Sequence, residues 1–277
     1  MQSCVKCGVL ALLLLQCWAQ DSSEKEPLRS RIVRLMSQEH ETFTRFDSGY
    51  EGKSERQPYV VALDFSRSGT TNWFCAGAII DRHWIVTMAT CTNPATAVRV
   101  MYGAGNRNES GPSVYVAKLS FFAHKDFNRL YQNDIALINV PYIRYTNTVQ
   151  PVALPTSEVP PEDHWMHTMG WGQHKGNTRL MHQLHVMPIQ LMHNEHCMKS
   201  GYIRRYVPQM LCLQLPNAET SCRIDSGSPL VTSNPPVLLG MASFGDHYGC
   251  QSKAPLIYTR IGSYIGWILK VMAGSYE

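Results

Sequence analysis

The sequence predicts an all-β fold, a barrel or a sandwich, for most of its 277 residues. From about Gln57 onward, short apolar runs alternate with turns that are rich in Gly, Pro, Asn and Asp. Many residues of these runs are β-branched or aromatic, which suits the pleated surface of a sheet. In chain order the runs are Tyr59–Leu63, Ala78–Ile80, Trp84–Ala89, Val98–Tyr102, Val114–Phe122, Ile135–Val140, Leu184–Ile189, Val237–Ala242 and Leu256–Thr259.

Two segments have a helical pattern instead. Asn194–Lys199 is compatible with a short helix, and Ser263–Met272 predicts a terminal one. In the terminal segment, four apolar residues recur at helical spacing and would share one face: Ile265, Ile268, Leu269 and Met272.

Residues 1–19 are predicted to be a secretory signal peptide. Lys6 supplies the positive charge, Val9–Leu15 the apolar run, and Cys17 and Ala19 the small residues before the cleavage point. The apolar run is far shorter than the roughly 20 residues of a membrane span, so we expect export without a membrane anchor. Residues 20–45 are polar and charged and indicate a leader or pro-segment.

The cysteine count supports an exported chain. The chain has nine cysteines, and cleavage of the signal peptide removes three of them. Six in an exported protein suggest three disulfides; they are Cys75, Cys91, Cys197, Cys212, Cys222 and Cys250. Asn108 begins an N-glycosylation sequon within a turn rich in Gly, Asn and Pro, as expected for a surface acceptor.

Charge and histidine pattern exclude several classes of function. The net charge of +4 comes from 25 basic and 21 acidic residues with no long basic run, so we expect no nucleic-acid partner and no polybasic membrane patch. Three His-x-x-His pairs raise the alternative of a metal site: His164/His167, His182/His185 and His193/His196. Residues three apart in a strand point to opposite faces, and no third ligand is visible, so we expect neither metal nor cofactor.

Four segments occur in a diagnostic order: Trp84–Cys91, Asn133–Ile138, Gly170–Gly172 and Ser221–Val231. Together they resemble the chymotrypsin/trypsin family of serine proteases over roughly residues 46–273. The resemblance implies two six-stranded Greek-key β-barrels, at about 46–150 and 151–277, with a C-terminal helix. It also implies the disulfides Cys75–Cys91, Cys197–Cys212 and Cys222–Cys250.

The chemistry of that family needs a serine nucleophile, a histidine base and an aspartate that orients the histidine. Ser226 matches the nucleophile and Asp134 the aspartate. Thr90 stands where the histidine is expected, directly before Cys91. A threonine hydroxyl cannot accept a proton near pH 7, so we expect no ordinary protease activity.

Other positions of the family's site also depart from its pattern. Ile224 replaces the glycine whose N–H helps bind the oxyanion, and its β-branched side chain would crowd that place. Ser228 replaces the second glycine after the nucleophile. At the specificity pocket, the floor position is Thr220 and not aspartate, and Leu256 stands at a wall position that is usually glycine, where it would partly fill the pocket.

The activation site is altered as well. Active members are cut after a basic residue, and the new apolar N-terminus pairs with the aspartate before the nucleophile, here Asp225. The matching segment is Arg45-Phe46-Asp47, a poor match to the usual apolar pair, while Arg31-Ile32-Val33 lies too far before Cys75. We therefore expect this insertion to be weakened or absent.

The resulting hypothesis is a secreted protease homologue that acts as a non-enzymatic binding or regulatory protein. Its expected partners are extracellular proteins such as active proteases or their substrates. Inactive secreted relatives serve as cofactors or decoys in protease cascades, in immunity and in seminal fluid and the reproductive tract, and no residue selects among these roles.

Two alternatives from other classes stay open. One is a specialised hydrolase that uses Ser226 with an unusual base, for which His247 and His83 are the candidates. The other is a glycan-binding protein. Its support is small, because the charge of +4 becomes +3 once Lys6 is removed with the signal peptide.

Overall fold

The computed structural model describes residues 57–67, 71–103, 105–108, 111–156, 165–172, 182–192, 197, 208–214, 224–244 and 255–274. Several sequence predictions lie outside these residues: the signal peptide at 1–19, the leader at 20–45, the Arg45–Phe46 segment, Thr220, His247, the Cys222–Cys250 pair, and all of the Asn194–Lys199 segment except Cys197. In the described part of the chain, no helix is long and apolar enough to cross a membrane.

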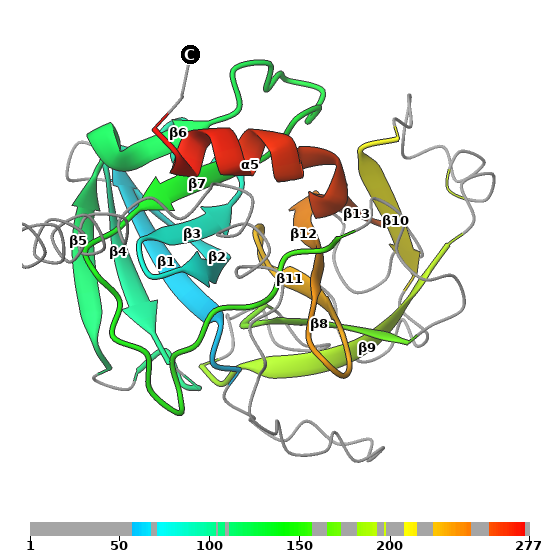
Figure 1. Ribbon diagram of the computed structural model, residues 1–277, viewed down its shortest axis with the longest axis horizontal. Helices are drawn as coiled ribbons and strands as arrows, with labels where there is room; N and C mark the ends of the chain where they lie inside the picture. The colour runs from blue at the N-terminus through cyan, green and yellow to red at the C-terminus, as the bar shows by residue number, and fades with distance from the viewer. Residues whose placement is uncertain are drawn as a thin grey trace, which may run out of the picture. The chain divides into compact units, whose positions relative to one another are not determined.

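The N-terminal half forms a seven-stranded antiparallel sheet (Figure 1). Its strands follow the order β5-β4-β1-β2-β3-β7-β6. They span Val60–Arg67 (β1), Thr71–Asp81 (β2), Trp84–Thr87 (β3), Ala97–Tyr102 (β4), Ser113–Ala117 (β5), Phe121–Ala123 (β6) and Ala136–Asn139 (β7). The short helix α3, Ala89–Thr92, follows β3.

This sheet corrects the predicted six-stranded barrel for the N-terminal half. The sequence run Val114–Phe122 was expected to be one strand, but the 3-10 turn η1, Lys118–Ser120, divides it into β5 and β6. These two strands are the opposite edges of the sheet. The sheet therefore curls, and its two edge strands are connected along the chain by η1 but are not paired with each other by backbone hydrogen bonds.

The C-terminal half forms the predicted closed six-stranded barrel, in the order β10-β13-β12-β11-β8-β9. Its strands span Met166–Gly170 (β8), His185–Leu191 (β9), Met210–Gln214 (β10), Pro229–Thr232 (β11), Leu238–Phe244 (β12) and Leu256–Arg260 (β13). The 3-10 turn η3, Ile261–Tyr264, then leads into helix α5, Ile265–Met272, which confirms the predicted terminal helix.

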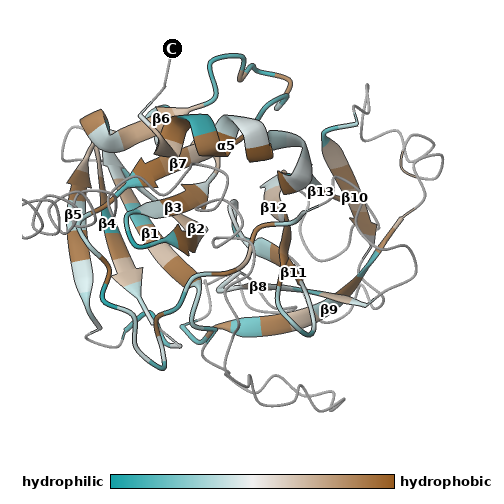
Figure 2. Ribbon diagram, in the orientation of Figure 1, coloured by the Kyte–Doolittle hydropathy of each residue, from teal (hydrophilic) through white to brown (hydrophobic). Residues whose placement is uncertain are grey.

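Helix α5 packs against the N-terminal half, near β6 and β7 (Figure 1). Its buried residues Ile268 and Val271 join the hydrophobic cluster of the curled sheet. That cluster also takes in Met169, Trp171 and Met241 from the barrel strands or their ends. Figure 2 shows hydrophobic residues along β7 and β10 and on part of α5. One hydrophobic cluster thus extends across both halves, and a second one lies inside the closed barrel.

In the described part of the chain, two disulfides bond strands to neighbouring segments. Cys75 in β2 is bonded to Cys91 in α3, and Cys197 is bonded to Cys212 in β10. Both pairings are those that the family resemblance implies. The first one fixes α3, and therefore Thr90, against the curled sheet.

Candidate active site

Three sequence-predicted residues come together where the two halves meet. Thr90 lies in α3, Asp134 lies two residues before the first residue of β7, and Ser226 lies in the turn before β11. The Ser226 turn is held against the curled sheet, because the Ala76 N–H donates to the Ser226 carbonyl at 2.8 Å. Gly227 follows with φ +84, and a Cβ there would collide with the Ala76 carbonyl, so only glycine allows this approach.

Asp134 is fully buried and its carboxylate is bound by hydrogen-bond donors. The Thr90 N–H donates to Oδ1 at 2.8 Å, and the Thr90 hydroxyl donates to Oδ2 at 3.1 Å. The Ser243 hydroxyl donates to the same Oδ2 at 2.6 Å. Thr90 thus contacts the carboxylate with its own backbone and side chain, on the side where a histidine was expected.

Burial raises the pKa of Asp134, since a charged carboxylate loses its hydration there. Hydrogen bonds lower that pKa in opposition, first from the Ser243 hydroxyl, then from the backbone and hydroxyl of Thr90 and the backbone of Ala89. Asp134 also affects a neighbouring group: burial raises the pKa of the Tyr264 hydroxyl, and the charge of Asp134 raises it further. The aspartate is therefore a buried acceptor that depends on its donors.

The partners Ser243 and Thr259 were missed by sequence reasoning as ligands of Asp134. Ser243 is 109 residues away along the chain, and the Thr259 hydroxyl donates to the Asp134 carbonyl at 2.7 Å across 125 residues. One feature of the sequence could have indicated Ser243: it begins the Ser-Phe-Gly segment, which in the family lines the substrate cleft.

Ser226 has no base beside it among the described residues. Its half-buried hydroxyl donates a long hydrogen bond of 3.5 Å to the Ser243 carbonyl. His83, a candidate substitute base, is exposed in the turn between β2 and β3, with Nδ1 3.2 Å from the Val140 carbonyl. The structure therefore does not bring His83 to Asp134.

The two bulky substitutions near Ser226 share one environment. Ile224 and Leu256 are both half-buried and pack against the hydrophobic cluster inside the closed barrel. Leu256 begins β13 and pairs with Leu213 of β10. That Ile224 crowds an oxyanion and that Leu256 fills a specificity pocket both stay predictions.

Asp225 is buried beside the Gly170-Trp171 motif. Its Oδ2 accepts the Trp171 N–H at 2.6 Å. A Cβ on Gly170 would lie 2.8 Å from that oxygen and 2.6 Å from the Ser228 hydroxyl oxygen, so glycine permits the close approach. The Ser228 hydroxyl is buried without a hydrogen-bond partner in the described part of the chain.

The loop before Asp134 takes an unusual backbone path. Tyr131 and Asn133 have φ of 58 and 54, in the left-handed region that is uncommon for residues other than glycine. Two contacts hold this path: the Tyr131 ring packs on Phe244 with centroids 4.9 Å apart, and the Asn133 side-chain oxygen accepts the Tyr264 hydroxyl at 3.0 Å.

Other predicted sites stand apart from this region. Asn108 is exposed, and its N–H donates to the Asn106 side chain at 2.9 Å in a surface turn. Glycosylation there stays a prediction. Within the described residues, no group of three His, Cys, Asp or Glu side chains is placed to hold a metal ion.

A curled sheet and a closed barrel that bring an aspartate and a serine together define a scaffold of the serine-protease class. The family model described as Trypsin matches residues 46–268, and the chain belongs to this family. Serine protease 1 of Drosophila melanogaster is 33% identical over 228 residues, covering 81% of this chain and 84% of that protein. A collagenase of Hypoderma lineatum is 32% identical, with coverage of 81% and 86%. The solved structure of HL collagenase has a TM-score of 0.68 at 31% identity, covering 78% of this chain and 94% of its own.

Proposed function

We propose that this member of the trypsin family is a secreted protein without protease activity that binds or regulates other extracellular proteins. The observation that carries the proposal is the double donation of Thr90 to Asp134. In an active site of this class the aspartate orients an imidazole, which accepts the serine proton. Here the Thr90 hydroxyl donates to the same carboxylate, but unlike an imidazole it has no basic nitrogen that could accept the serine proton.

Replacing the histidine with threonine should lower turnover by a large factor. Members of a catalytic triad act as a unit, and loss of one typically lowers turnover by on the order of 10⁴–10⁶. Ser226 donates to a backbone carbonyl, which cannot take its proton. Among the described residues, the site keeps the scaffold's aspartate and serine, and none of the hydrogen-bond partners of Ser226 or Asp134 is a base that could activate the serine near neutral pH.

Secretion is part of the same proposal. The predicted signal peptide and the disulfides support it, since family members with disulfides are typically secreted and such bonds persist in oxidising compartments. The partners would be active extracellular proteases or their substrates, in an immune, reproductive or other cascade. Loops on a rigid β scaffold remain a recognition surface after the chemistry is lost.

The proposal is tested by labelling the purified secreted protein with a fluorophosphonate, which reacts with activated serines. We expect the parent protein to label no more than Ser226→Ala, with active trypsin as the positive control. Strong labelling that Ser226→Ala abolishes would contradict the proposal and favour the alternative hydrolase with an unusual base.

A further inference from the structure

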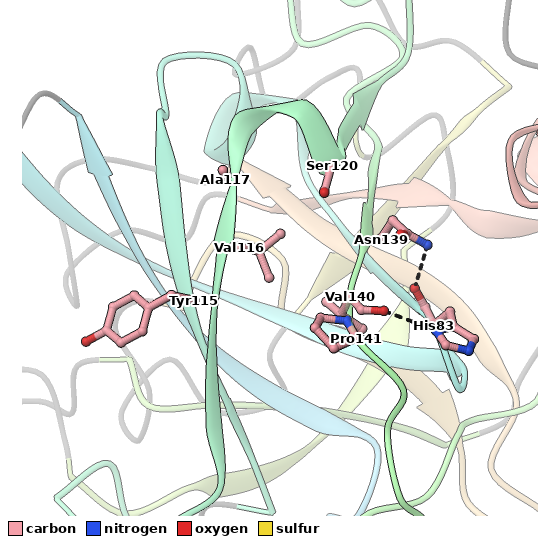
Figure 3. A pocket seen from close by; sticks show the side chains of 8 residues that line it. All are labelled: His83, Tyr115, Val116, Ala117, Ser120, Asn139, Val140 and Pro141. Atoms are coloured by element: carbon pink, nitrogen blue, oxygen red, sulfur yellow. Dashed lines mark hydrogen bonds between the residues drawn. The ribbon is translucent and has the colours of Figure 1, made fainter.

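The curled sheet leaves a hollow at the seam between its two edges. The hollow has a volume of about 430 Å³. It is lined by β5 and η1 on one side and by the end of β7 and the β2–β3 turn on the other, as Figure 3 shows. The lining residues are His83, Tyr115, Val116, Ala117, Ser120, Asn139, Val140 and Pro141, and none of them is acidic.

The outer edge of β5 carries backbone groups that do not face β4. The Lys118 N–H donates to the Thr96 carbonyl, and the Pro112 carbonyl accepts the Tyr102 N–H, at 2.9 and 3.0 Å. The backbone N–H and C=O groups of the even-numbered residues of β5 therefore face β4. Because the direction alternates along an antiparallel strand, the N–H and C=O groups of Ser113, Tyr115 and Ala117 face the seam.

On the opposite wall of the hollow, the pairing between β6 and β7 also stops before the end of β7. β6 pairs with β7 only from Phe121↔Ile138 to Ala123↔Ala136. The His124 N–H donates to the Ile135 carbonyl, and alternation from that pair directs the backbone of Asn139 toward the seam. No described strand occupies the space between Asn139 and β5.

Natural edge strands are usually blunted by charges or proline within them. β5 has the sequence SVYVA, which contains neither. Tyr115 is 75% exposed, and Leu119 and Tyr142 next to the hollow are 95% and 60% exposed. An open, uncharged strand edge with exposed apolar side chains is a template for adding another strand.

Charge near the hollow selects among occupants. Lys118 follows β5 and is exposed. Arg82 adjoins His83, with its guanidinium 3.9 Å from the centre of the Tyr145 ring and 5.1 Å from that of Tyr142. One acid, Asp81, also lies nearby and accepts the His83 N–H at 3.0 Å, but the two cations outnumber it. The cations favour an acidic occupant.

We propose that the β5 edge binds an extended acidic segment of another protein, which adds to the sheet as a strand in which acidic and β-branched residues alternate. The β-branched side chains would lie over the hollow beside Val116, and the acidic ones near Lys118 and Arg82. This site is separate from the Thr90–Asp134 site, and a catalytically active chain could use it equally. Failure here would leave the fluorophosphonate result unaffected.

The test uses the full secreted chain and the peptide acetyl-EVEVEVE-amide, with acetyl-KVKVKVK-amide as the charge control. In the free protein, we expect the amides of Tyr115 and Ala117 to exchange rapidly with solvent and that of Val116 to be protected. Addition of the acidic peptide should protect both outward amides, with a Kd below about 1 mM. Protection in the free protein would show that the chain covers its own edge, and would overturn the proposal.

A matched pair of variants separates backbone pairing from general contact. Ala117→Pro removes one outward N–H, and the φ of −88 at Ala117 is close to what proline adopts, so β5 should fold normally. Ala117→Thr keeps the N–H. We expect Ala117→Pro to weaken binding about fivefold relative to Ala117→Thr, as for loss of one hydrogen bond. Equal binding by both variants, equal binding of the lysine peptide, or no saturable binding would each overturn the proposal.

Discussion

Thr90 determines which groups contact Asp134. Only one side chain differs from the family's triad, but both the backbone N–H and the hydroxyl of Thr90 donate to the Asp134 carboxylate. The hydroxyl of Ser243 completes a set of donors around a carboxylate that has no exposed surface. A buried charge is tolerated only where such donors replace its lost hydration. Asp134 and Thr90 therefore have a structural role even without catalysis.

Ser243→Ala should destabilise the protein in a pH-dependent manner. The Ser243 bond opposes the effect of burial more than any other, so its removal raises the pKa of Asp134 further above the ordinary 3.8. Well below pH 3.8 the carboxyl is protonated in both folded and unfolded chains, and the variant's deficit should be small. As pH rises through the folded-state pKa values, the deficit should grow to about 1.5–3 kcal/mol, the value of a hydrogen bond to a charged group.

Urea unfolding at a series of pH values measures this deficit. Thr259→Val is the matched control, because Thr259 contacts the Asp134 carbonyl and not its carboxylate. Its deficit should not vary with the ionisation of Asp134. A Ser243→Ala deficit that is constant from pH 3 to pH 8 would show that Asp134 does not ionise as described.

Thr90→His by itself should not restore protease activity. The new imidazole could accept the Ser226 proton, but Ile224 would still crowd the oxyanion position. Hydrolysis of a peptide substrate library should stay near background for the single variant. It should rise at least about tenfold in Thr90→His/Ile224→Gly, as for recovery of part of the oxyanion stabilisation. High activity of the single variant would show that Ile224 is no obstacle.

At the scale of elements, the 3-10 turn η1 decides the form of the N-terminal half. It splits one apolar run into β5 and β6 and leaves them as the two edges of the sheet. Apolar periodicity could predict that residues 114–122 form extended structure. It could not predict the break, since the run stays apolar on both sides of it.

The terminal helix should contribute strongly to stability because it covers the curled sheet. Ile268 is completely buried in the cluster shared with that sheet. Ile268→Ala should lower the free energy of unfolding by about 2–5 kcal/mol, as for other large-to-small core substitutions. Lys270→Ala, an exposed position on the same helix, should change it by less than about 0.5 kcal/mol. Denaturant unfolding checks both values, and similar effects would place Ile268 outside the core.

At the scale of the molecule, the two halves share one hydrophobic cluster, in addition to the separate cluster inside the barrel, and they are joined by a backbone hydrogen bond at the site. The apolar cluster of the curled sheet includes Trp171 and Met241 from the barrel half, together with α5. The Ala76–Ser226 hydrogen bond joins the nucleophile turn to β2. A shared core means that neither half can lose its packing without exposing apolar surface of the other.

We therefore expect the disulfide-intact protein to unfold in one transition. Tryptophan fluorescence and far-ultraviolet circular dichroism should give the same midpoint in guanidinium chloride. Separate midpoints would show that the two halves unfold independently, contrary to the shared core.

The sequence by itself determined the family, the all-β class, the terminal helix and the presence of Thr90 beside Cys91. These follow from short motifs and local periodicity, in which neighbouring residues carry the information. Only the tertiary structure decided that Ser243 and Thr259 bind Asp134, that His83 lies away from it, and that an open seam remains beside β5. Those contacts join residues more than 100 positions apart or depend on how a sheet curls, and neither is encoded in local spacing.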